Sequence, residues 1–101
     1  MRIAVIEDER PIREGLVHIL NKISPEYQVV GSAENGREGL ILLEEQDPDL
    51  ILLDMIMPLL SGMDTARELR QHDPHVPIIF LTSSPEFALE SYEVRTFWYL
   101  L

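Results

Sequence analysis

The stretch that decides the fold is LILLD at residues 50–54, in which four consecutive apolar residues end in an aspartate. Two other stretches have the same form, IAVIED at residues 3–8 and IIFLT at residues 78–82. Short runs that are apolar throughout are typical of central parallel strands, because helices cover both of their faces. If the three runs are neighbouring strands, the polar residues after them meet at the sheet edge where ligands bind in open parallel sheets.

Three carboxylates would converge at that edge, those of Glu7, Asp8 and Asp54. Like charges at short range repel strongly in a partly desolvated site, so this arrangement makes physical sense only with a bound cation. A small set of oxygen-only ligands at an open edge favours magnesium over zinc or calcium. The sequence therefore predicts a Mg²⁺ site at these acids.

Amphipathic stretches of ten or more residues alternate with the apolar runs, which is the pattern of βα units around a parallel sheet. Strands are predicted near residues 3–6, 50–53 and 78–81. Residues 27–30 are mixed in polarity and predict an edge strand, and residues 97–101 predict a fifth strand. The expected architecture is one α/β domain.

Helix starts are marked by capping residues and prolines. Pro11 suits a first helical position. Asn35 precedes a second helix, although Gly39 lowers its intrinsic stability by about 1 kcal/mol relative to alanine. Ser61 with an acid three residues on resembles a capping box, and Ser84 followed by proline predicts a fourth helix. The apolar residues that follow Pro11 at helical spacing are Ile12, Leu16, Ile19, Leu20 and Ile23.

The composition excludes several classes of protein. Eighteen acidic against eight basic residues give a net charge of −10, which opposes nonspecific binding to nucleic acid phosphates or anionic lipid. The absence of cysteine excludes a disulfide scaffold and a thiolate nucleophile, and fits a cytoplasmic location. The apolar runs are far too short to span a bilayer, and the N-terminus does not have the form of a signal peptide.

Three motifs together resemble the receiver domain of two-component response regulators. They are IEDE at residues 6–9, LDMIMP at residues 53–58 with Gly62, and LTS at residues 81–83. The resemblance implies a doubly wound, flavodoxin-like, three-layer α/β/α fold with a five-stranded parallel sheet of order 2-1-3-4-5. It covers almost the whole chain, so that residues 1–101 would form one receiver domain.

The resemblance also implies a role for each site residue. Asp54 would be the phosphoacceptor, Thr82 the switch hydroxyl and Tyr99 the switch aromatic. On phosphorylation, Thr82 would turn toward the acyl phosphate and Tyr99 would swing into the space left behind. Tyr99 also fits ordinary core packing, because aromatic residues precede it.

The magnesium ligands implied by the resemblance are Glu7, Asp8, Asp54 and the backbone carbonyl of Ile56. Glu7 departs from the family, in which an aspartate is commoner at this position. Its extra methylene changes the reach of the carboxylate and preserves the charge. The site is expected to survive with an altered affinity for magnesium.

A second departure concerns the end of the chain. Receivers continue with a lysine, a proline and a last helix, and the only lysine here is Lys22, near the end of the first helix. The domain is therefore expected to be C-terminally incomplete, with its last helix missing and one counter-cation lost. Slower phosphorylation is predicted, together with marginal stability, dimerisation or other self-association through the uncovered apolar residues 97–101.

The leading interpretation is a phosphorylation-dependent signalling receiver that accepts a phosphoryl group from a sensor histidine kinase. The segment at residues 80–93 resembles receivers attached to LytTR-type DNA-binding domains. This implies a transcriptional regulator whose DNA contacts lie in an output domain absent from the chain, and a phosphoacceptor rather than a turnover enzyme.

Two alternatives remain open. A phosphohydrolase of the haloacid dehalogenase type also uses an aspartate at a strand end, but it needs a second acid two residues later, where this chain has Ile56. A pseudo-receiver or truncated receiver would act only as a dimerisation or docking module.

Overall fold

The computed structural model describes residues 1–55, 57, 59–81 and 98–100, the last three by their backbone. Up to residue 81, strands and helices alternate along the chain as the sequence predicts. The elements are β1 (Arg2–Ile6), α1 (Arg10–Ile23), β2 (Gln28–Ala33), α2 (Gly36–Gln46), β3 (Leu50–Asp54), α3 (Gly62–His72), β4 (Ile78–Leu81) and β5 (Trp98–Leu100). The described part of the chain contains no helix with the length and apolar character of a membrane span.

The strands form one parallel sheet in which β1 lies between β2 and β3, and β4 follows β3. This order, 2-1-3-4, is the predicted one. The backbone of β5 pairs with the free edge of β4, with Phe80 opposite Tyr99. Ile6 lies opposite Leu53 in the register of β1 and β3, so that the polar residues that follow them lie side by side.

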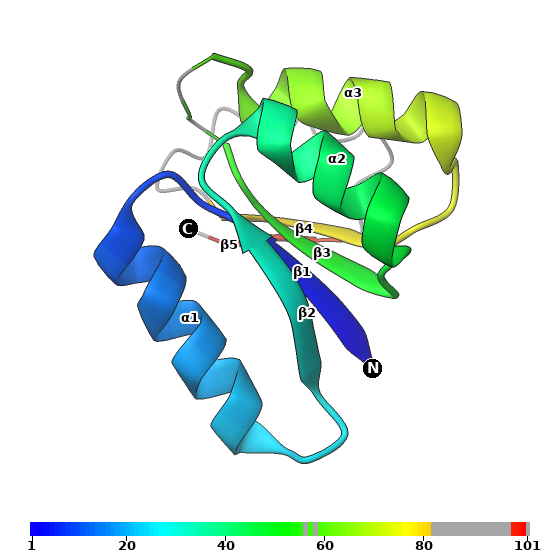
Figure 1. Ribbon diagram of the computed structural model, residues 1–101. Coiled ribbons are helices and arrows are strands. Elements are labelled where there is room, and N and C mark those ends of the chain that lie inside the picture. Colours follow the sequence, from blue (N-terminus) through cyan, green and yellow to red (C-terminus); the bar gives the residue numbers. More distant parts are fainter. Residues whose placement is uncertain (56, 58, 82–97, 101) are drawn as a thin grey trace.

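Helices cover the sheet on both faces, with α1 on one side and α2 and α3 on the other (Figure 1). The described residues thus form the predicted three layers. Alternate residues of β1 face opposite sides, since Ala4 and Ile6 pack with α2 and α3 whereas Ile3 and Val5 pack with α1. This alternation with fully apolar strands is what a sheet covered on both faces requires.

The predicted caps of two helices are confirmed. The side-chain oxygen of Asn35 accepts a hydrogen bond of 2.8 Å from the backbone N–H of Glu38, at the start of α2. The hydroxyl oxygen of Ser61 accepts one of 3.2 Å from the backbone N–H of Asp64, at the start of α3. Each bond satisfies one of the amide groups that a helix start leaves without a partner.

Two boundaries differ from the sequence predictions. The edge strand β2 runs on to Ala33, because it continues to pair with β1 after a register shift between Ile3 and Ala4. The sequence did not predict this extension, since neither Gly31 nor Ser32 favours a strand by itself. The other difference is that Asp54 is the last residue of β3, opposite Leu81, and not the first residue after the strand.

Candidate functional site

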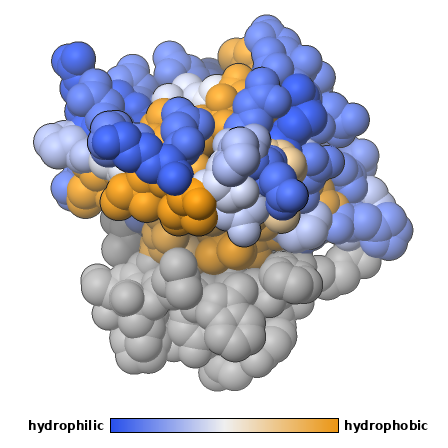
Figure 2. Space-filling model, turned by 90° about the horizontal axis from the view of Figure 1, so that it is seen from below, coloured by the Kyte–Doolittle hydropathy of each residue, from blue (hydrophilic) through white to orange (hydrophobic). Residues whose placement is uncertain are grey.

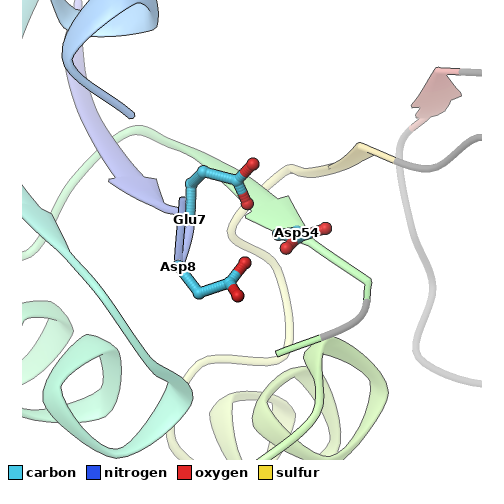
Figure 3. A group of neighbouring side chains, drawn as sticks. All are labelled: Glu7, Asp8 and Asp54. Carbon is cyan, nitrogen blue, oxygen red and sulfur yellow. The ribbon is translucent and has the colours of Figure 1, made fainter. Parts of the chain in front are cut away.

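Three acidic side chains converge at the carboxyl edge of the sheet, as predicted. Glu7 and Asp8 directly follow β1, and Asp54 ends the neighbouring strand β3 (Figure 3). One carboxylate oxygen from each residue lies within 4.8 Å of the corresponding oxygens of the other two. The register of the two strands produces this convergence, because the residue after Ile6 lies beside the residue after Leu53.

Burial distinguishes Glu7 from the other two acids. This residue is only 5% exposed, whereas Asp8 and Asp54 are half-buried. The Oε2 atom of Glu7 is fully buried and has no hydrogen-bond partner among the described residues. A buried carboxylate oxygen without a partner carries a large desolvation cost, which a bound cation would offset. The three oxygen donors and this orphaned atom therefore fit a magnesium ion.

The backbone of the β1–α1 connection is fixed from two sides. The N–H of Glu7 donates a hydrogen bond of 3.0 Å to the carbonyl of Ala33 on β2. From α1, Nη1 of Arg13 donates to the carbonyls of Glu7 at 2.9 Å and Asp8 at 3.4 Å. These bonds hold both acidic residues in place while leaving their carboxylates free to face Asp54.

The segment after Asp54 is also held close to the site. The N–H of Met55 donates to the carbonyl of Leu81 at 3.2 Å, and the N–H of Gly62 donates to the carbonyl of Met55 at 3.0 Å. A Cβ atom at Gly62 would lie 2.1 Å from the carbonyl oxygen of Asp54 and 2.7 Å from Cα of Met55. Only glycine permits this approach, because both neighbours are backbone atoms.

Sequence reasoning missed the part that Arg13 plays in the site, and it quoted Gly62 only as part of a motif. The clue for Arg13 was its position five residues after Asp8, within the first turns of the helix that follows the acidic pair. No local pattern indicates that Gly62 touches the backbone of Asp54, because the two residues are brought together by the closure of the β3–α3 loop.

Several predicted site residues lie outside what the structure describes. These are the carbonyl of Ile56, Thr82 with the helix predicted from Pro85, and the side chain of Tyr99. Lys22 is described and lies in the last turn of α1. It is twelve residues from the start of that helix at Arg10, or about 18 Å along the axis, so it is far from the acidic cluster, as predicted.

Comparison with known proteins gives a consistent family match. The family described as the response regulator receiver domain matches residues 3–101. An uncharacterized response regulatory protein of Vibrio cholerae is 38% identical over 100 residues, which are 97% of this chain and 38% of that protein. The sensory transduction protein LytT of Oceanobacillus iheyensis is 34% identical and is matched over 100% of this chain and 42% of its own length.

Solved structures with the same fold also match the chain. A two-component response regulator of the LuxR family from Aurantimonas sp. superposes with a TM-score of 0.89 at 30% sequence identity. The match covers 97% of this chain and 71% of that structure. The chain thus spans about two fifths of the curated relatives named above and most of a solved counterpart.

Proposed function

The chain belongs to the response regulator receiver domain family, and on this premise we propose that Asp54 accepts a phosphoryl group from a sensor histidine kinase. Receivers are phosphoacceptor signalling modules of two-component systems and not turnover enzymes. The observation that carries the proposal is the convergence of three carboxylates, with a buried oxygen of Glu7 that lacks a described partner.

Each acid has a distinct part in the proposed reaction. Asp54 is the nucleophile, as the family resemblance implies, and it is half-buried at the strand end and more accessible than Glu7. Glu7 and Asp8 hold the metal, together with Asp54 and the carbonyl of Ile56. A magnesium ion bound there supplies positive charge against the carboxylate and phosphoryl oxygens. The bonds from Arg13 to the backbone carbonyls of Glu7 and Asp8 hold the main chain that carries the metal-binding carboxylates, which limits the reorganisation needed during transfer.

The proposed response to phosphorylation is a change of surface. Thr82 follows β4, which pairs with β3 so that Leu81 lies opposite Asp54. By the family resemblance, its hydroxyl turns toward a phosphoryl group on Asp54, and Tyr99, whose backbone lies opposite Phe80, follows as the switch aromatic. The complete domain is proposed to have the five-stranded order 2-1-3-4-5. Two surface states would then exchange populations on phosphorylation.

The wider biological role follows from the relatives. The two named curated relatives are more than twice as long as this chain, which leaves room in them for an output domain. We place the activity of the whole protein in transcriptional regulation in the cytoplasm, with DNA bound by such a domain. The resemblance to LytTR-type receivers agrees with the match to LytT. A receiver that serves only for dimerisation or docking is the alternative.

Intact-mass spectrometry after exposure to acetyl phosphate tests this proposal. The chain should gain one phosphoryl group when magnesium is present and none after chelation. Asp54→Asn should abolish the gain, whereas Asp47→Asn should retain it. Asp47 is a matched control because it has the left-handed φ of 47°, which asparagine tolerates well. A gain that persists in Asp54→Asn would refute the assignment. No gain in any variant, and none in a chain extended through the family's lysine, would favour the docking module.

A further inference from the structure

A groove of about 550 Å³ lies at the opposite end of the sheet from the acidic cluster, between the C-terminal ends of α2 and α3. These two helix ends lie at the same end of the molecule (Figure 1). The floor of the groove is apolar and consists of core residues, among them Leu43, Ile51 and Leu69. The volume lies within the range of about 300–1,000 Å³ that ligand sites commonly have.

The rim of the groove is strongly acidic. Glu44 and Asp47 contribute from the α2 side, and Glu68 and Asp73 from the α3 side. The carboxylate of Asp73 accepts hydrogen bonds from the N–H groups of two following residues, so it is fixed in place. Glu44 and Glu68 are exposed and have no ion-pair partner among the described residues. No lysine or arginine is among the lining residues, all of which are described, and His72 is the one basic side chain there. The guanidinium of Arg70 lies next to the groove, where it donates hydrogen bonds to the carbonyls of Asp73 and Val76.

A second copy of the chain is a poor occupant for this groove. Each copy has a net charge of −10, so a contact through four carboxylates would add to a general repulsion between copies. Carboxylates on both sides of an apolar floor instead match a ligand with positive charges on both sides of an apolar centre. A peptide segment with leucine-like residues flanked by lysine or arginine has this pattern.

We propose that the groove between α2 and α3 is a docking site for a basic, apolar-centred peptide segment of another protein. Ile41, which is 53% exposed at the rim, extends the apolar surface outward for the anchoring side chains. Ile51 and Asp54 are three residues apart on β3, or about 10 Å. The groove and the acidic cluster are therefore separate surfaces, and a segment bound in the groove leaves Asp54 accessible.

The test is a fluorescence anisotropy titration of the full chain with the fluorescein-labelled peptide KRLLRK, in the presence of saturating magnesium to occupy the acidic cluster. Saturable binding is expected. The double variant Glu44→Gln/Glu68→Gln should raise the dissociation constant about tenfold, because exposed charge pairs each contribute modestly. Ile41→Ser should also weaken binding, without any change in charge.

Controls separate a specific groove from general attraction to an acidic protein. Glu26→Gln/Glu45→Gln removes the same charge from exposed positions outside the groove and should leave the affinity unchanged. The peptide KRSSRK should bind much more weakly than KRLLRK. Equal losses in both double variants, equal binding of both peptides or no saturable binding would overturn the proposal. Sedimentation showing a dimer that only the groove variants dissociate would overturn it in favour of a second copy.

Discussion

The two faces of the sheet are both covered by helices with an apolar side, yet they are packed very differently. The face under α2 and α3 holds most of the buried apolar residues, whereas Ile3, Val5 and Leu52 are the buried members of the cluster under α1. Although the structure describes all fourteen residues of α1, none is buried. An amphipathic pattern therefore predicts a helix and its apolar stripe, but not how much of that stripe is buried in the fold.

The exposed part of that stripe is substantial. Ile12, Ile19 and Ile23 are 46%, 55% and 61% exposed, whereas Leu16 and Leu20 pack against the sheet. On the face seen in Figure 2, hydrophobic patches lie between hydrophilic ones. Exposed apolar side chains that lie together on one helix, as these isoleucines do, commonly mark an interaction surface. The face under α1 therefore contributes less to the stability of the fold, and its exposed side is the better candidate for an interaction surface.

The largest expected difference is in stability. Ile78→Ala removes a fully buried side chain from the α2 and α3 face and should lower the free energy of unfolding by about 3–4 kcal/mol. Ile19→Ala on α1 makes the same chemical change and should cost less than about 1 kcal/mol. Urea denaturation followed by circular dichroism measures both. Similar losses would show that the two faces are packed alike.

Two glycines offer a comparison of opposite sign. A Cβ atom at Gly39 on α2 would lie 2.7 Å from Cδ1 of Ile6, so Gly39→Ala should destabilise the chain by about 1–2 kcal/mol. At Gly15 on α1 nothing lies within 4 Å, so Gly15→Ala should stabilise it by about 0.5–1 kcal/mol through helix propensity. Thermal unfolding of the two variants would expose the contrast, and a gain of stability in both would contradict it.

The sequence predicts self-association through residues 97–101, and the exposed isoleucines of α1 offer a second surface for it. If copies associate through α1, Ile19→Lys should weaken the dimer about tenfold, because a charge replaces an apolar contact. Analytical ultracentrifugation over a range of concentrations measures the change. His18→Lys, an exposed neighbour on the same helix, controls for the added charge. A monomer at all concentrations in the unmodified chain would remove the basis for the predicted dimer.

The smallest expected effect concerns an exposed ion pair on α1. The hydrogen bond and charge of Arg10, 2.8 Å from Glu14, lower the pKa of Glu14 below its ordinary value. A lowered pKa gives a stabilisation that is present at neutral pH and is lost as the pH falls through the pKa of the folded state. Both side chains are mostly exposed, so Glu14→Gln should change stability barely measurably at neutral pH, and not at all in acid.

Sequence alone determined most of the architecture. Apolar runs without alternation predicted the strands, since strands covered on both faces need apolar residues on both sides. Asn35 and Ser61 predicted two helix starts, because their side chains bond the amide groups nearest in the sequence. The acids at the ends of two runs predicted the cluster at the sheet edge, because parallel strands place their carboxyl ends together.

Only the tertiary structure decided the features that depend on residues distant along the chain. It placed Gly39 against Ile6 and Gly62 against Asp54, so that glycines that look costly in a helix or loop are required by close packing. It buried the Oε2 atom of Glu7 and directed Arg13 to the carbonyls of the acidic pair. It also left the isoleucines of α1 in solvent. Local sequence sets backbone preference and periodicity, whereas burial and contact depend on which surfaces the folded chain brings together.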